Sequence, residues 1–196
     1  MQFGTLAIME LEKSNSNTSK TNNGDLEKNG YVVIKNFWEP EEFYYPVPRE
    51  RGRITYFGRI DKFSHNEEME IPGSLGRWHH PQYSKAFNII RSRLEKEIGK
   101  KLFNAYYYDR FYFTGQEYPK HVDNPPGEFT VAIHISDNLK NNWPLYIKTP
   151  DVYTDENKSA VLIPGRADSI VLDPGDALIY KGCERPLWRD TLPVTK

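Results

Sequence analysis

The sequence predicts a mainly β domain of the sandwich or jelly-roll class, supported by a helical region on its N-terminal side. Three observations lead there. Short β-branched or aromatic runs alternate with Pro, Gly, Asp and Asn, which is typical of strands joined by turns. One stretch has helical periodicity. Hydrophobic residues make up 38% of the 196 residues, and this fraction includes aromatic residues at 14%, whose large side chains can bury much apolar surface. One domain with a modest core is therefore expected.

The N-terminal part separates from the body by composition. Residues 12–24 are almost wholly small and polar, so burial cannot offset the entropy lost on ordering them. The sequence therefore predicts a flexible segment over residues 1–24 and a single domain over residues 25–196. The apolar patch over residues 3–11 is expected to dock on the body or to remain free.

The body begins with short elements. Residues 25–30 are expected to form a helical turn that ends at Gly30. The β-branched run Tyr31–Ile34 predicts a strand. Three prolines then interrupt regular structure, so residues 39–52 are expected to be a loop.

One long helix is expected, over residues 82–102. Its apolar positions recur at spacings of three and four, at Phe87, Ile90, Leu94 and Ile98. The segments that follow have strand character. These strand-like segments cover residues 104–113, 128–135, 145–148, 169–172 and 177–180.

Charge and cysteine content exclude several classes of partner. The chain has 26 Lys and Arg against 27 Asp and Glu, a net charge of −1, so no overall field attracts nucleic acid or an anionic membrane. No apolar stretch approaches the ~18 residues of a membrane span. The single cysteine, Cys183, excludes an internal disulfide and favours a reducing compartment. A cytoplasmic protein is expected.

The pair His121 and Asp123 is the first candidate site. Residues i and i+2 of an extended segment point the same way, so an imidazole and a carboxylate at this spacing can hold one cation. A second imidazole would complete the two-His, one-carboxylate triad of Fe(II) enzymes. The alternative is a surface histidine beside a turn aspartate. If the pair binds a metal, its ligand atoms should lie about 3–4 Å apart, because both contact one ion at roughly 2.1 Å.

The sequence context supports the metal interpretation. Residues 112–123 read Y-x-x-G-Q-x-Y-x-x-H-x-D, which resembles the metal-site entrance of the Fe(II)/2-oxoglutarate-dependent dioxygenases, in particular the prolyl 4-hydroxylase-like branch. Residues 29–37 are similar to the N-terminal G-Y-V-V-I strand of that superfamily, and residues 173–180 to its P-G-D-A strand. The resemblance implies a double-stranded β-helix, a jelly roll with the iron at its open end.

The resemblance also implies roles for individual residues. His121 and Asp123 match two iron ligands. Tyr112 matches a tyrosine that binds 2-oxoglutarate, and Tyr118 matches a pocket tyrosine. Ordinary packing is the alternative for both tyrosines.

Three further residues are weaker candidates. Lys148 lies in the region where some relatives bind the distal carboxylate of 2-oxoglutarate, and Arg189 is a substitute anchor for the same group. Their alternatives are a solvated lysine and a surface arginine. His134, on the strand after the motif, could face the substrate pocket or pack in the core.

The chain departs from the family at the third ligand. No histidine follows His134, and Leu187 stands where the resemblance places the distal iron-binding histidine. Other ligand types are available nearby in sequence or in a loop. These weaker candidates are His134, Cys183, Glu184 and one of the adjacent pair His79 and His80.

Two functions from different classes follow. The first is a hydroxylase that uses Fe(II) and 2-oxoglutarate on a small-molecule or peptide substrate. The second is a degenerate or truncated relative that acts as a non-catalytic binding or scaffold protein. The chain ends at Lys196, where the family continues with a last strand. A bare edge is therefore expected beside the strand before Cys183, covered either by the patch over residues 3–11 or by a second subunit in a homodimer.

Overall fold

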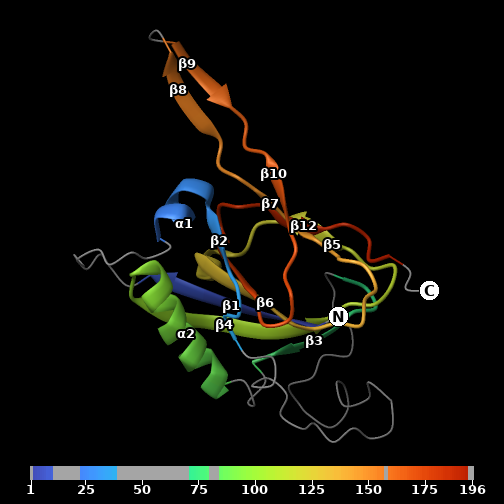
Figure 1. The fold of residues 1–196 in the computed structure, drawn as a ribbon. Coiled ribbons are helices and arrows are strands. Elements are labelled where there is room, and N and C mark those ends of the chain that lie inside the picture. Colours follow the sequence, from blue (N-terminus) through green and yellow to red (C-terminus); the bar gives the residue numbers. More distant parts are fainter. Residues whose placement is uncertain (1, 11–22, 39–70, 80–83, 157–158, 194–196) are drawn as a thin grey trace, which may run out of the picture.

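The computed structural model describes residues 2–10, 23–38, 71–79, 84–156 and 159–193. Within these ranges the chain is mainly β, with two helices, and its paired strands are antiparallel. Two sheets face one another, and a two-stranded arm projects from the body (Figure 1). The predicted β-sandwich class is confirmed. The loop expected over residues 39–52 lies outside the described residues.

The larger sheet has six strands in the order β2-β11-β6-β1-β4-β3. Its strands are β1 (Gln2–Glu10), β2 (Tyr31–Ile34), β3 (Leu75–Trp78), β4 (Leu102–Phe111), β6 (Phe129–Ser136) and β11 (Ala177–Lys181). The four-stranded sheet has the order β10-β7-β12-β5. Its strands are β5 (Tyr118–His121), β7 (Leu145–Lys148), β10 (Ala167–Ile170) and β12 (Leu187–Arg189). The arm consists of β8 (Val152–Glu156) and β9 (Ser159–Ile163).

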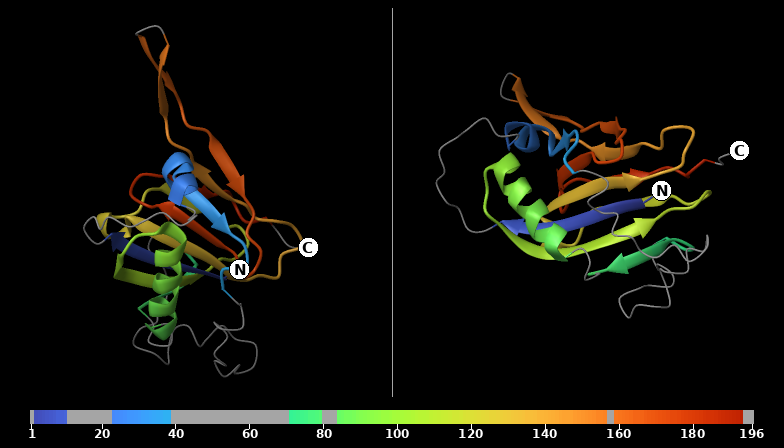
Figure 2. Two further views of the ribbon diagram at one scale, coloured as in Figure 1. Left: turned by 60° about the vertical axis from the view of Figure 1, so that its left-hand side comes forward. Right: turned by 60° about the horizontal axis from the view of Figure 1, so that its bottom comes forward.

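The helices lie against the outer face of the six-stranded sheet (Figure 2). Helix α1 (Asn23–Asn29) ends at Gly30, whose positive φ of 78° suits glycine and whose N–H donates to the Leu26 carbonyl. Helix α2 (Ser84–Ile98) ends earlier than the expected residue 102, and residues 82 and 83 lie outside the described residues. Its buried residues pack on β6 in one apolar cluster. Members of this cluster include Phe87, Ile90, Leu94, Ile98, Val131, Ile133 and Ile135.

A second apolar cluster fills the space between the two sheets. It takes side chains from alternate positions of the facing strands, as the two-residue period of a strand requires. Members include Ala132, Leu145, Ile147, Leu178 and Leu187. Burial of a Leu or Ile side chain contributes about 1.5–3 kcal/mol, so this cluster supplies much of the adhesion between the sheets.

Part of the segment expected to be flexible, residues 2–10, forms a strand, while residues 11–22 lie outside the described residues. Residues 2–10 form β1, which pairs with β6 on one side and β4 on the other (Figure 2). The bare edge expected before Cys183 is also absent, because β11 pairs with β2 and with β6. That edge is therefore not free to pair with a second subunit, and the homodimer itself stays a prediction.

Neither helix in the described part of the chain has the length and apolar character of a membrane span.

Candidate functional site

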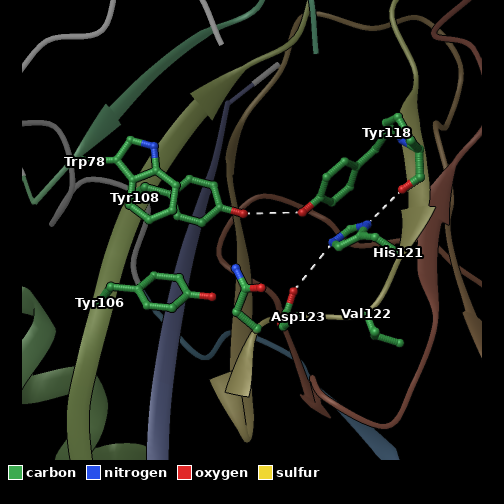
Figure 3. Close-up of a pocket in the computed structure, with 9 residues that line it drawn as sticks. Trp78, Tyr106, Tyr108, Tyr118, His121, Val122 and Asp123 are labelled. Carbon is green, nitrogen blue, oxygen red and sulfur yellow. Dashed lines mark hydrogen bonds and ion pairs between the residues drawn. The ribbon is translucent and has the colours of Figure 1, made fainter. Parts of the chain in front are cut away.

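The candidate site is a pocket of about 360 Å³ between the two sheets (Figure 3). One wall is aromatic and comes from β3 and β4. The opposite wall comes from β5 and the loop after it. The lining residues are Trp78, Tyr106, Tyr108, Tyr118, Pro119, His121, Val122, Asp123 and Asn124.

His121 and Asp123 meet in this pocket. The distance from His121 Nε2 to Asp123 Oδ1 is 3.5 Å, within the range expected for two ligands of one ion. Their side chains are 29% and 10% exposed. His121 is the last residue of β5, and Asp123 follows it by two positions, so the spacing that the sequence showed does bring both groups to one side.

A hydrogen bond to the backbone orients the imidazole of His121, so that its Nε2 faces Asp123. Its Nδ1 lies 2.8 Å from the carbonyl oxygen of Pro119 and donates a hydrogen bond to it. This bond favours the tautomer with a lone pair on Nε2, and Nε2 faces Asp123. The same arrangement orients metal-binding histidines in proteins.

The carboxylate of Asp123 is held from the other sheet. Thr130 on β6 donates a hydrogen bond from Oγ1 to Oδ2 at 2.6 Å, and the Tyr180 hydroxyl on β11 donates to the same oxygen at 3.0 Å. Burial, with the neighbouring Asp123 carboxylate, raises the pKa of Tyr180 well above its usual value, so this hydroxyl remains a donor. Sequence analysis missed both residues, because nothing local marks them as partners of Asp123.

Sequence analysis also missed Tyr106 and Tyr108 in the aromatic wall. Trp78 stacks on Tyr108 with ring centroids 4.5 Å apart, and Tyr106 lies 5.4 Å from the Trp78 ring. The Tyr108 and Tyr118 hydroxyls lie 3.3 Å apart across the pocket, in agreement with the assignment of Tyr118 to its lining (Figure 3). The i, i+2 spacing of Tyr106 and Tyr108 was the available signal.

The position expected for a third ligand holds a leucine. Leu187 on β12 is paired directly with His121 on β5, and it is 2% exposed in the cluster between the sheets. Cross-strand partners share a face of the sheet, with Cβ atoms about 4.5–5.5 Å apart. Among the described residues no group of three His, Cys, Asp or Glu side chains could hold a metal.

The other candidates for a third metal ligand do not line the pocket with His121 and Asp123. His79 is exposed and its ring contacts Tyr107, and His80 lies outside the described residues. Cys183 is exposed, and its thiol donates to the backbone carbonyl of Asn124 at 3.3 Å. Partial desolvation and nearby carboxylates, including that of Asp123, raise the pKa of the thiol. Glu184 is exposed and lies beside Arg185.

His134 is corrected from a pocket residue to a core residue. It is 2% exposed, and its Nδ1 lies 2.6 Å from the Leu172 carbonyl oxygen. Its Nε2 lies 3.0 Å from Asp137 Oδ2. On β6 it lies four residues beyond Thr130, or about 13 Å at about 3.4 Å per residue, so it does not line the pocket.

Tyr112 and Arg189 lie in the interior next to the pocket. Tyr112 is 5% exposed, and burial raises its pKa to about 12. Arg189 is 4% exposed rather than on the surface. It donates to the Trp143 carbonyl at 2.6 Å and pairs in register with Tyr118. Arg110, which the sequence did not single out, lies nearby with its guanidinium 5.2 Å from the Tyr118 ring centre.

Lys148 does not reach this interior. Its ammonium forms an ion pair with Asp151 at 3.1 Å. On β7 the neighbouring Ile147 points into the core between the sheets, so Lys148 points to the opposite face of the strand. The expected contact of Lys148 with a co-substrate is therefore not supported.

Comparison with known proteins finds a similar fold among solved structures but no similar sequence. No family model matches the sequence, and no curated protein matches it. A crystal structure of a Pseudomonas putida prolyl-4-hydroxylase is similar in fold, with a TM-score of 0.57 and 14% identity over 86% of this chain and 88% of that chain. At that identity the likeness shows a prolyl-4-hydroxylase-like fold, in agreement with the sequence resemblance.

Proposed function

We propose that this chain is a hydroxylase that depends on Fe(II) and 2-oxoglutarate, with His121 and Asp123 as two of the metal ligands. The observation that carries the proposal is the facing pair of His121 Nε2 and Asp123 Oδ1, 3.5 Å apart, at a pocket in a fold similar to that of a prolyl-4-hydroxylase. The donor types suit Fe(II), which takes imidazole and carboxylate ligands.

The interior beside the pocket supports a site for an anionic co-substrate. Arg110 and Arg189 are both buried close to Tyr118, and Tyr112 lies beside them. Burial lowers the pKa of Arg189 to about 10, so its guanidinium remains charged at neutral pH. A dicarboxylate such as 2-oxoglutarate would place a carboxylate among these cations and hydroxyls.

The bound metal would supply the redox chemistry by which O₂ and 2-oxoglutarate give succinate, CO₂ and a hydroxylated substrate. The chain's own residues bind and orient. His121 and Asp123 hold the ion, and the aromatic wall of Trp78, Tyr106 and Tyr108 excludes water and packs on the substrate, which we expect to be a small molecule or a peptide.

The test is anaerobic titration with Fe(II), followed by measurement of succinate formed from 2-oxoglutarate in air. We expect binding that is lost in His121→Ala, and succinate that requires Fe(II). His79→Ala is the matched control, because His79 is exposed and lies outside the pocket. Equal metal affinity in His121→Ala and in the wild type would contradict the proposal.

A second candidate function is favoured by Leu187. With a leucine paired to His121, the chain could keep the pocket and bind a ligand without catalysis. Leu187→His separates the two functions, because it adds an imidazole on the face that His121 occupies. Succinate formed by the wild type supports the hydroxylase. Succinate formed only by Leu187→His supports the non-catalytic binding protein.

A further inference from the structure

The two oxygens of the Asp123 carboxylate have different surroundings. Oδ2 accepts the hydrogen bonds of Thr130 and Tyr180, at 2.6 and 3.0 Å. Oδ1 faces His121 Nε2 and the pocket. One oxygen therefore accepts hydrogen bonds from the protein, while the other faces His121 and the pocket.

Both donors come from one cross-strand pair. Thr130 on β6 and Tyr180 on β11 are direct partners in the six-stranded sheet, so their side chains share the inner face. They are 0% and 1% exposed, which shields their hydroxyls from water. Buried hydroxyls require partners, and Asp123 supplies the acceptor for both.

Gly182 completes the enclosure. Its carbonyl accepts the Asp123 backbone N–H at 2.9 Å, and its own N–H donates to the Glu128 carbonyl at 3.1 Å. A Cβ at this position would collide with Asp123 Oδ2 and lie 2.6 Å from Thr130 Oγ1. Only glycine leaves room for the carboxylate to sit against the two hydroxyls.

We propose that Thr130, Tyr180 and Gly182 are positioning residues, which fix Asp123 so that it binds a divalent cation through Oδ1 alone. The inference rests on the proposed metal site at His121 and Asp123. Its physical basis is preorganisation. The carboxylate loses little rotational freedom on binding, because two hydroxyls and a tight backbone contact already restrict it.

The test measures Co(II) affinity by anaerobic titration, with the visible spectrum of the bound ion as a second readout. Thr130→Val and Tyr180→Phe each remove one hydroxyl with little change in volume. Loss of such a supporting contact typically costs 10–100-fold in metal affinity, so we expect the Kd to rise by about tenfold or more in each variant. Gly182→Ala should shift the spectrum as well, because it displaces Asp123.

Two controls separate positioning from general destabilisation. Thr130→Ser keeps the hydroxyl and should restore a Kd near that of the wild type. Tyr31→Phe removes a comparable bond, from the Tyr31 hydroxyl to Asp168 at 2.7 Å, in a part of the molecule that does not line the pocket. It should leave the Kd unchanged. Wild-type Kd values in both Thr130→Val and Tyr180→Phe would overturn the inference.

A wild-type chain that binds no Co(II) would contradict the proposed function and the cation that this inference takes from it, but not the positioning of Asp123. The positioning claim is then decided without metal, by urea unfolding of Asp123→Ala, Tyr180→Phe and the double variant. We expect the double variant to lose less stability than the sum of the two single losses, because both remove the same contact. Strict additivity would overturn the claim.

Discussion

Two neighbouring strands of the four-stranded sheet carry opposite kinds of side chain at the same level of the pocket. On β5, His121 is partly exposed and its ring nitrogen is oriented by the Pro119 carbonyl. On β12, its partner Leu187 is almost fully buried among apolar side chains. One strand presents a polar side chain to the pocket, and the other packs in the core.

This difference assigns core packing and pocket lining to different residues at the site. Leu187 contributes to the core between the sheets, so this part of the fold does not depend on a bound ion. His121 and Asp123 instead face one another at the pocket and are held by hydrogen bonds to Pro119, Thr130 and Tyr180. In the proposed function, catalysis would depend on position 187 of β12, whereas metal binding would depend on β5 and its loop.

The largest expected effect tests the packing role of β12. Leu187→Ala should lower the free energy of unfolding by about 2–5 kcal/mol, because it leaves a cavity in the core. Urea unfolding without metal measures this change. Val122→Ala is the matched control, since Val122 is 50% exposed and should change stability little. Equal, small losses in both variants would contradict the packing role of Leu187.

The next effect tests the binding role of the loop after β5. Asp123→Asn keeps an acceptor for Thr130 and Tyr180 but removes the charge, so metal affinity should fall by more than about 100-fold, beyond the usual cost of losing a supporting residue. The free energy of unfolding should change far less in Asp123→Asn than in Leu187→Ala. The Kd for Mn(II), measured by electron paramagnetic resonance, checks this, and an unchanged Kd would remove Asp123 from the ligand set.

A smaller effect concerns the co-substrate. If 2-oxoglutarate binds beside Tyr112, Tyr112→Phe should weaken it by about 0.5–1.5 kcal/mol, the net contribution of one hydrogen bond. Lys148→Met is the comparison, because the Lys148 ammonium is paired with Asp151 outside this interior. Calorimetric titration should show weaker binding in the first variant only. The reverse result would move the co-substrate site toward β7.

The smallest expected effect is the pH dependence that the buried His134 gives to the free energy of unfolding. Burial lowers the pKa of His134, and its contacts with the Leu172 carbonyl and Asp137 oppose this only in part. The unfolded chain therefore takes up this proton more readily than the folded one. The contribution of His134 to stability should be complete above its unfolded pKa of about 6.5 and decline as pH falls below it.

Urea unfolding between pH 7.5 and about pH 5, in the wild type and in His134→Gln, measures this decline. The wild type should lose more stability over this range than the variant does. Parallel curves would show that His134 titrates alike in the folded and unfolded chain.

The sequence by itself determined the elements whose pattern is local. The strand Tyr31–Ile34, the helix through Ile90 and Leu94, and the β7 strand Leu145–Lys148 are in place because side-chain periodicity reflects burial of one face. The His121 and Asp123 spacing was also readable, because two residues separated by one position on an extended chain reach the same side.

Tertiary structure decided what depends on pairing between distant segments. Residues 2–10, which include most of the apolar patch over residues 3–11, became an inner strand of the six-stranded sheet, since pairing with β4 and β6 satisfies the backbone on both sides. Strand pairing also set Thr130 and Tyr180 opposite one another beneath Asp123, and Leu187 beside His121. Register between strands is a long-range property that no local pattern contains, so the residues that support the site could be found only in the fold.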